Sequence, residues 1–330
     1  MGIADLNKFL ADKNPDIFVT IDIFDLQGHR VAIDGNCVGY MLMHRAIKRC
    51  FQRKDFLPLS REVILESWMK MWVEYLKMYL GYGITPVMVI DGEAPEAKDD
   101  TRANREEKGR KAREALEFAI QELDGSDLTR DRYRKAMLGS IYVSRVEMRL
   151  AFDMISDAGV PSFVAPGEGE RFCTSLCREG LVATVDSRDT DTLAMGCPTV
   201  INNISGSQVK VVSLARALES LECSQDFFTD LCIMGGCDFN SNIPGIRLKK
   251  ALPLLQKAGC IEGVSLARDV SMLNYEKCRE LFAYEPSGLS DEDMVVTRDL
   301  GPSTKYVKET YLLRQMVDSC LPGHFGQLEL

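Results

Sequence analysis

The sequence predicts an α/β fold in which a mostly parallel central sheet is flanked by helices on both faces. Short apolar runs of the kind buried in parallel sheets alternate with longer segments of helical periodicity. Two of these runs, at 30–33 and 86–90, are each followed by an aspartate and a glycine, at Asp34 and Asp91. Ligands of parallel sheets bind beyond the carboxyl ends of the strands. The pattern therefore predicts acidic side chains gathered at one edge of the sheet.

The first half of the chain is predicted to add two amphipathic helices. One follows the first strand and runs through Ile47. The other covers 60–79, with Ser60 as its N-cap and with Trp68 and Trp72 on its apolar face. Both tryptophans are therefore expected in the core.

The middle of the chain is charged and helical in pattern. One helix is expected over 98–122, a Gly-Ser-Asp break at 125–127 ends it, and a second basic helix is expected over 129–157. Between Lys98 and Arg149, 13 Lys and Arg stand against 11 Asp and Glu, a local charge of +2 in a chain of net charge −9. A basic segment beside an acidic pocket suits a metal-dependent enzyme that acts on nucleic acid, although two solvated helices explain the same charges.

The rest of the chain is predicted to continue with strands, a hairpin and two helices. The expected strands cover 160–164 and 181–185, the hairpin joins 200–201 to 209–212, and the helices cover 227–236 and 247–258 with the turn IPGI before the second.

The densest group of acids lies within 159–195. Glu168 and Glu170, then Asp189 and Asp191, are two carboxylate pairs at i, i+2 spacing, each beside a short apolar run and a predicted helix start. Carboxylates this close raise one another's pKa unless a cation neutralises them, so a divalent metal site is expected. Each acid taken alone is equally well explained as a helix cap or first-turn residue.

The ligands of such a site would all be oxygen atoms. The chain has 3 His, and its 11 Cys lack the paired CxxC spacing of a zinc site. Oxygen donors favour Mg²⁺ or Mn²⁺ over zinc. The scattered cysteines are interpreted as reduced thiols in a reducing compartment.

Composition and hydropathy favour a soluble intracellular protein. A hydrophobic content of 45% can fill a sizeable core, no apolar run reaches the length of a membrane span, and no basic segment followed by an apolar signal core opens the chain. Leu6 stands where the myristoylation pattern needs Ser or Thr.

Six blocks of sequence stand out within roughly residues 1–260: MGIADL, VAIDGN, PVMVIDGEAPEAK, VPSFVAPGEGERFC, DSRDTDTLAMG and GGCDFNSNIPGIRLKKAL. Taken together and in this order, they resemble the flap endonuclease group of the XPG family of structure-specific 5′ nucleases. The resemblance implies a 5′-nuclease, PIN-like fold with a helical arch and a helix-two-turn-helix hairpin. It also implies hydrolysis of phosphodiester bonds at 5′ flaps or 5′ ends of branched or nicked duplex DNA in replication or repair, in the nucleus or wherever DNA is replicated, the cytoplasm included.

In this family seven carboxylates hold two divalent ions, Mg²⁺ or, in its place, Mn²⁺. All seven matching positions are acidic here, and Asp189 is expected to be essential for catalysis. The seven are Asp34, Asp91, Glu168, Glu170, Asp189, Asp191 and Asp238.

The resemblance also implies a layout for a single nuclease domain over 1–330. Its parts are an N-terminal nuclease region at 1–97, the helical arch at 98–150, a second nuclease region at 151–260 with a DNA-binding hairpin at 236–258, and a C-terminal helical region at 261–330.

Four further positions match family contacts to DNA. Lys98 and Arg105 match a basic pair at the base of the arch that grips the scissile phosphate, and their seven-residue spacing puts both on one helix face. Tyr40 matches an aromatic residue that stacks on a base, with a buried core tyrosine as the alternative. Gly2 matches an N-terminal residue that lies near the site.

The hairpin departs from the family pattern. Its turn contains Gly245, and the family continues Gly-Pro-Lys-Lys where this chain has Arg247-Leu248-Lys249-Lys250. The departure weakens the case for a K⁺ site at the hairpin, whereas duplex contact through Arg247, Lys249 and Lys250 is still expected. Pro253 is expected to kink the following helix.

Two other departures concern the metal site and the C-terminus. Arg188 occupies a position that is commonly acidic in the family, and Asp186 adds a nearby acid. The last residues lack a sliding-clamp-binding motif, so a clamp partner cannot be inferred from them. The protein is predicted to act as a monomer.

Three functional interpretations stay open at the level of sequence. The first is a 5′ flap endonuclease, with a 5′–3′ exonuclease or a junction resolvase as variants of it. The second is a non-catalytic module that binds branched DNA, and the third is a protein-interaction scaffold. The complete set of acidic positions favours the first.

Overall fold

The computed structural model describes residues 2–52, 57–92, 99–294 and 306–320. Its contacts group the chain into two compact units. The first comprises Met1–Asp34, Tyr82–Lys98 and Phe163–Val295, and the second comprises Gly35–Gly81, Asp99–Ser162 and Val296–Leu330. Each unit is built from segments far apart in sequence. The division into 1–97, 98–150, 151–260 and 261–330 stays a prediction.

The sheet has seven strands in the order β1-β7-β6-β5-β2-β3-β4. Strand β2 pairs in parallel with β3 and β5, and β5 pairs in parallel with β6, whereas β7 is antiparallel to both β6 and β1. The strands are β1 (Phe18–Asp22), β2 (Arg30–Asp34), β3 (Thr85–Ile90), β4 (Ser162–Val164), β5 (Thr184–Asp186), β6 (Thr199–Ser205) and β7 (Gln208–Ser213). The predicted mostly parallel sheet flanked by helices is confirmed.

The first unit also contains eight α-helices among the described residues, of which α7 packs on the sheet. Helix α7 contacts β2, β3 and β5, the strands at its centre. The α-helices of this unit are α1 (Leu6–Lys13), α7 (Gly169–Arg178), α8 (Asp191–Ala194), α9 (Leu214–Leu221), α10 (Gln225–Gly235), α11 (Leu248–Ala258), α12 (Ile261–Ser265) and α13 (Tyr275–Phe282). Short 3₁₀ helices are η1 (Pro15–Ile17), η2 (Ile23–Leu26), η4 (Ser271–Leu273) and η5 (Asp291–Met294).

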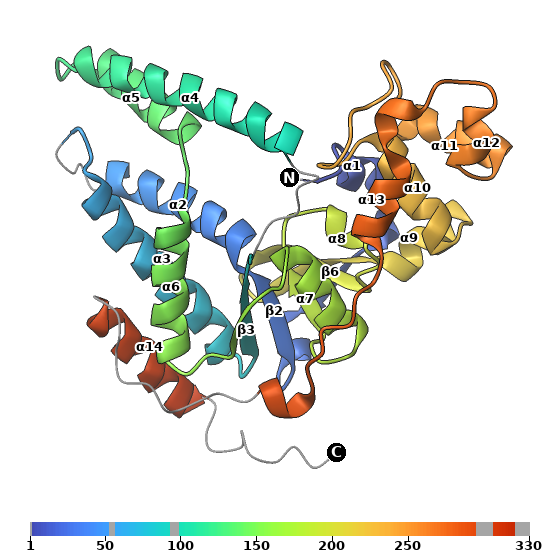
Figure 1. The fold of residues 1–330 in the computed structure, drawn as a ribbon. Coiled ribbons are helices and arrows are strands. Elements are labelled where there is room, and N and C mark those ends of the chain that lie inside the picture. The colour runs from blue at the N-terminus through green and yellow to red at the C-terminus, as the bar shows by residue number, and fades with distance from the viewer. Residues whose placement is uncertain (1, 53–56, 93–98, 295–305, 321–330) are drawn as a thin grey trace. The chain divides into compact units, whose positions relative to one another are not determined.

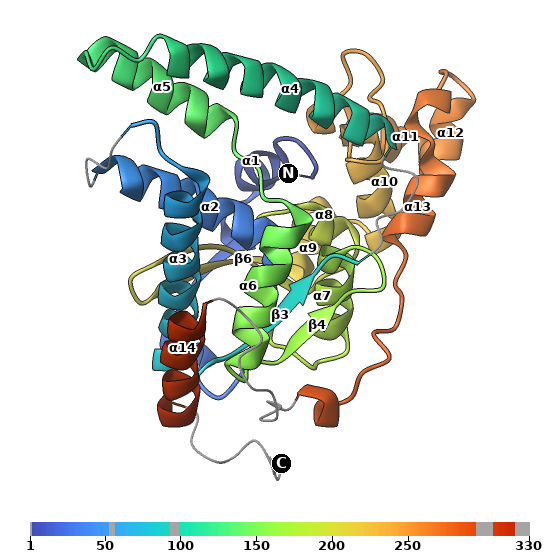
Figure 2. The same ribbon diagram turned by 60° about the vertical axis from the view of Figure 1, so that its left-hand side comes forward.

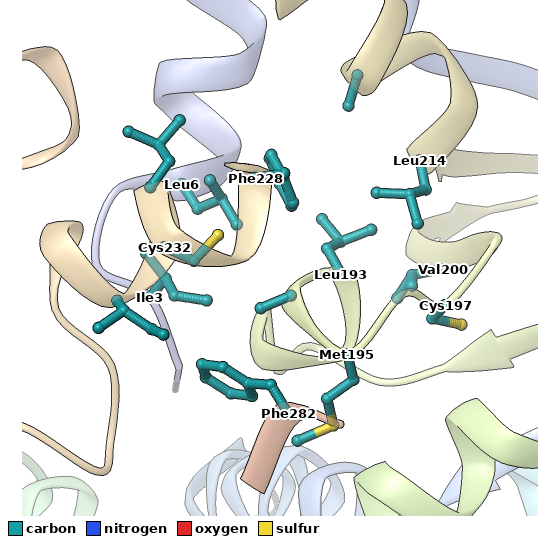
Figure 3. Close-up of a cluster of buried hydrophobic side chains, with 14 of the residues drawn as sticks. Ile3, Leu6, Leu193, Met195, Cys197, Val200, Leu214, Phe228, Cys232 and Phe282 are labelled. Atoms are coloured by element: carbon teal, nitrogen blue, oxygen red, sulfur yellow. The ribbon is translucent and has the colours of Figure 1, made fainter. Parts of the chain in front are cut away.

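A single large hydrophobic cluster holds the first unit together. Figure 3 shows part of it, where Phe228 and Cys232 of α10 lie with Leu6 of α1 and Leu193 of α8. Leu6 lies more than 180 residues from the other three in sequence. The loop that carries Asp189 and Asp191 is therefore anchored by apolar packing directly behind it, because Leu193 is 1% exposed.

The second unit consists of helices. They are α2 (Gly35–Gln52), α3 (Arg61–Gly81), α4 (Asp99–Gln121), α5 (Asp127–Gly139), α6 (Arg145–Asp157) and α14 (Val307–Cys320). Helices α4 and α5 form an antiparallel pair, which both ribbon views show (Figures 1 and 2). Trp68 and Trp72 are fully buried, as predicted. Among the described residues, no helix is both long and apolar enough to cross a lipid bilayer.

One helix prediction is wrong in its extent. The sequence predicts a single helix over 129–157, but α5 ends at Gly139 and α6 begins at Arg145. Ser144 caps α6 through a capping box with Glu147, in which each side chain accepts a hydrogen bond from the other residue's backbone N–H. The S-x-x-E spacing at 144–147 is the sequence signal for this break.

Two strands are shorter than predicted. The sequence predicts a strand over 181–185, yet β5 begins at Thr184. The amides of Leu181 and Val182 instead donate to Leu176 O at the end of α7, which ends that helix in a turn. The segment 160–164 likewise forms a strand only from Ser162. The predicted hairpin, in contrast, is longer than expected.

Candidate metal centre

Acidic residues stand at the carboxyl ends of three neighbouring parallel strands. Asp34 is the last residue of β2, Asp186 is the last residue of β5, and Asp91 directly follows β3. The register pairs Ile33 with Asp186 and Asp34 with Val89. The three acids therefore lie at one edge of the sheet, as the sequence predicts.

The start of α7 brings a second pair of acids to this edge. Gly169 N donates a hydrogen bond to Asp91 Oδ1 at 2.8 Å. A β-carbon at Gly169 would stand 3.0 Å from that oxygen, so the close approach depends on glycine. Glu168 is the N-cap residue and Glu170 lies in the first turn, and both are buried. Both therefore lie at the positive end of the helix dipole.

The loop after β5 adds two more carboxylates. Ser187 Oγ donates to Asp34 Oδ2 at 2.7 Å and accepts from Asp189 N at 3.1 Å. Asp191 N donates to Asp189 Oδ1 at 3.1 Å, and Thr192 Oγ1 donates to Asp189 O at 2.7 Å. This run of hydrogen bonds fixes the loop to the end of β2.

The buried thiol of Cys173 lies within the electrostatic influence of several of these carboxylates. Cys173 of α7 is fully buried, and burial raises the pKa of its thiol well above the usual value. The negative charges of Asp34, Asp91 and Glu170 raise this pKa further. The charges of acids from β2, α7 and the residue after β3 therefore all act on one buried side chain.

The donor chemistry of this edge fits divalent cations. Six of its carboxylates are at most 9% exposed, and burial of so many acids is costly unless cations compensate their charge. They are Asp34, Glu168, Glu170, Asp186, Asp189 and Asp191. Within the described ranges, however, no three His, Cys, Asp or Glu side chains are close enough together to hold a metal ion as they stand. The carboxylates are neighbours at one edge and do not form a closed cage, so their ligand roles stay predictions.

Asp238 lies in the loop that follows α10. It is half-buried, and the loop is tied to the end of that helix by two asparagines that the sequence analysis missed. Asn240 Nδ2 donates to Ile233 O at 2.8 Å, and Asn242 Nδ2 donates to Gly235 O at 2.7 Å. Asparagines just beyond a helix commonly satisfy its last carbonyls, which is the signal that could have identified them.

Gly2 lies against the loop that carries Asp189. Its φ is +75°, and a β-carbon there would overlap Asp189 Oδ1 and stand 2.8 Å from Thr190 Oγ1 and 2.9 Å from Asp191 N. The side chain of Thr190 also donates to Ile3 O at 3.2 Å. The structure therefore places Gly2 beside the acidic edge, as the sequence implied, while its contact with DNA stays a prediction.

The residues proposed to contact DNA near the arch belong to other parts of the chain. Lys98 lies outside the described residues. Arg105 lies on α4, for which only the backbone is described at 99–105. Tyr40 of α2 is 39% exposed, which disfavours the alternative of a buried core tyrosine and leaves its ring available for stacking.

The predicted DNA-binding hairpin at 236–258 consists of the segment after α10 and of helix α11, which packs against α10, and its helix-two-turn-helix role stays a prediction. Gly245 has φ +75°, and Ile246 N donates to Ile243 O at 3.0 Å across the turn. Arg247 is the N-cap residue of α11, and both Arg247 and Lys250 are exposed. Lys249 also is exposed, but its Nζ pairs with Asp12 Oδ2 at 2.8 Å. The helix continues through Pro253 to Ala258.

Arg188 lines a cavity of about 230 Å³ beside Asp189. Asn7 of α1 and Asn202 of β6 also line it, and Asn7 Nδ2 donates to Asn202 Oδ1 at 3.1 Å. Neither asparagine stands out in the sequence. Ser187 was also missed, although a serine two residues before an aspartate, directly after a strand, is a signal for a local side-chain turn.

Two domain models of one family match this chain. The XPG N-terminal domain matches residues 1–112, and the XPG I-region matches residues 159–238, together more than half of the chain. Flap endonuclease 1 from Macaca fascicularis is 30% identical over 276 residues, which cover 82% of this chain and 70% of the relative. The chain belongs to the XPG family. Both matched segments carry acids of the candidate metal centre, and the residues between them include α5.

Other members of the XPG family are also similar. Flap endonuclease 1 from Babesia bovis is 32% identical over 286 residues, which cover 86% of this chain and 41% of the relative. The chain thus spans less than half the length of that protein, and 60% and 63% of two further curated relatives. The solved flap endonuclease-1 from Methanococcus jannaschii has the same fold, with a TM-score of 0.59 at 24% identity, covering 92% of this chain and 96% of that one.

Proposed function

We propose that this XPG family protein is a Mg²⁺-dependent, structure-specific 5′ nuclease. It hydrolyses phosphodiester bonds at 5′ flaps or 5′ ends of branched or nicked duplex DNA, in replication or repair. The observation that carries the proposal is the edge of the sheet where buried carboxylates from β2, α7 and the β5–α8 loop come together. The similarity to flap endonucleases of other organisms supports the same function.

Seven acids are assigned as ligands of two Mg²⁺ ions, for which Mn²⁺ can substitute. They are Asp34, Asp91, Glu168, Glu170, Asp189, Asp191 and Asp238. Bound divalent ions supply an activated water and stabilise the leaving oxygen of the phosphate, so no protein nucleophile is required. Bound cations would offset the mutual repulsion of these carboxylates.

The basic residues have a separate role, which is to hold the DNA. Lys98 and Arg105 offset negative charge on the scissile phosphate. Tyr40 stacks on a neighbouring base, and Arg247 and Lys250 of the hairpin bind phosphates of the duplex. Lys249 contributes less to DNA binding than Arg247 and Lys250, because its ion pair with Asp12 must be broken or shared first.

Cleavage of a labelled 5′-flap substrate with and without Mg²⁺ tests the proposal. Asp189→Ala is expected to abolish cleavage and to leave DNA binding largely intact, because it removes a predicted metal ligand and no predicted DNA contact. Asp226→Ala provides the matched control, since Asp226 is an exposed acid at the start of α10. Full cleavage by Asp189→Ala would refute the assignment.

The class of substrate is tested in the same assay. A flap, a nick and a four-way junction, digested side by side, separate flap endonuclease from exonuclease and resolvase activity. Binding without cleavage of any substrate would favour a non-catalytic DNA-binding module. Affinity for DNA that does not change with salt would favour the protein-interaction scaffold instead.

A further inference from the structure

Ser187 links two strands at the centre of the acidic edge. It is the first residue after β5, and because Ile33 pairs with Asp186, Asp34 and Ser187 are the next residues along the two strands. Its Oγ lies 2.7 Å from Asp34 Oδ2 and 3.1 Å from Asp189 N. The side chain is almost fully buried, at 1% exposure. A residue with no charge thus joins two of the predicted metal ligands.

The two hydrogen bonds fix the direction of the hydroxyl group. The Ser187 hydroxyl has one proton, with which it donates a hydrogen bond to Asp34. One lone pair of its oxygen accepts a hydrogen bond from the backbone N–H of Asp189. The bond to an ionised carboxylate is charge-assisted and therefore stronger than a bond between neutral groups. It restricts rotation of the Asp34 carboxylate about its last torsion angle, which is otherwise broad.

The same hydroxyl sets the path of the following loop. Asp189 N is held by Ser187, and Asp189 Oδ1 in turn accepts from Asp191 N at 3.1 Å. Removal of the hydroxyl would take one hydrogen bond from the Asp34 carboxylate and one from the backbone of the loop at the same time. The geometry of two predicted ligands on different strands therefore depends on one side chain.

We infer that Ser187 is a positioning residue that orients Asp34 and Asp189 for divalent-cation binding. The inference rests on the proposed function, because it takes both acids as metal ligands. It assigns no chemical step to Ser187. Groups that hold metal ligands in place typically change metal affinity about 10- to 100-fold when they are removed.

Mn²⁺ binding to the DNA-free protein, measured by titration calorimetry, tests the inference. Ser187→Ala is expected to bind Mn²⁺ about 10- to 100-fold more weakly than the wild type. Ser187→Thr keeps the hydroxyl and is expected to restore most of the affinity. The matched control is Ser175→Ala, which removes another buried serine hydroxyl, one whose Oγ lies 2.5 Å from Glu285 O and 3.2 Å from Arg171 O, backbone carbonyls of two residues that are not predicted ligands.

A cleavage assay adds a second measurement. In Ser187→Ala the Mg²⁺ concentration for half-maximal cleavage is expected to rise by the same factor, while KM for DNA stays unchanged. A Ser187→Ala protein that binds Mn²⁺ as tightly as the wild type would overturn the inference. So would equal losses of Mn²⁺ affinity in Ser187→Ala and Ser175→Ala, because the effect would then be one of general stability.

The wild type separates this inference from the proposed function. Wild-type protein that takes up no Mn²⁺ would refute the metal site and the role of Ser187 with it. Wild-type protein that binds Mn²⁺ but cleaves no DNA would refute the nuclease function, and the comparison of Mn²⁺ affinities would still decide the role of Ser187.

Discussion

Gly2→Ala is the most informative single change at the edge of the site. The glycine has φ +75°, a left-handed conformation that costs an alanine about 1–2 kcal/mol. The new methyl group would also overlap Asp189 Oδ1 and stand 2.8 Å from Thr190 Oγ1. Contacts under about 3 Å between such atoms force one of them to move.

The clash is expected to displace the Asp189 carboxylate or the N-terminal segment. Asp189 is held by hydrogen bonds from Asp191 and Thr192, so moving it would break those bonds. Ile3, the residue after Gly2, is 2% exposed, so moving the N-terminal segment would disturb its packing in the core. Displacement of a metal ligand by a few tenths of an ångström is expected to weaken Mn²⁺ binding about 10- to 100-fold, as other disturbances of ligand geometry do.

Gly28→Ala separates the clash from the backbone strain. Gly28 has φ +76° and nothing within 4 Å of its ideal β-carbon, so the substitution carries the same conformational cost without the contact. Gly28→Ala is expected to lose about 1–2 kcal/mol of stability in urea denaturation, and Gly2→Ala at least as much, because it adds the clash. Only Gly2→Ala should lose Mn²⁺ affinity and flap cleavage, and equal Mn²⁺ affinity in the two variants would refute this account.

Three further predictions concern the hairpin, the pH dependence of stability and a helix cap. Replacement of Arg247 and Lys250 by Ala should lower the slope of log K for DNA against log salt by about 1 for each phosphate that the hairpin no longer binds, and an unchanged slope would exclude the hairpin from the interface. Hydrogen bonds from Arg279 lower the pKa of Glu262 from 4.5 to about 2. The stabilisation of the fold by the Glu262–Arg279 ion pair is therefore complete above pH 4.5 and is lost as the pH falls toward 2. The difference in Tm between the wild type and Glu262→Gln should vanish over that range. A difference that persists at pH 2 would contradict the ion pair. Ser144→Ala removes the cap of α6 and should cost about 1 kcal/mol in urea denaturation, whereas an unchanged stability would show that the cap is redundant.

The strands that carry the acids could be predicted because their signals are local. An apolar run followed by Asp and Gly marks the end of a buried strand, and both Asp34 and Asp91 stand where this pattern puts them. The hairpin of β6 and β7 is predictable for the same reason, since its turn residues lie between two apolar runs. Local pattern singled out Asp34, Asp91 and the two carboxylate pairs at 168/170 and 189/191, whereas the family resemblance added Asp238 and the ligand role of all seven.

Contacts between distant segments could not be predicted. Nothing near Ser187 in the sequence indicates that its hydroxyl meets Asp34, because the bond depends on β5 pairing with β2. The break between α5 and α6 does have a local signal, the S-x-x-E capping box at 144–147, which the prediction of a single helix overlooked. The arrangement of the carboxylates around bound cations depends on side-chain rotamers, which cannot be predicted from local sequence pattern.

The position of β5 beside β2 has a consequence for how the protein matures. About 150 residues separate these two strands, so the chain must close a long loop before the acids from its two halves can meet. A nascent chain that has not yet released β5 from the ribosome cannot possess the complete acidic edge, whatever helices it has already formed. The acids of the β5–α8 loop can therefore meet Asp34 only after more than half of the chain has been synthesised.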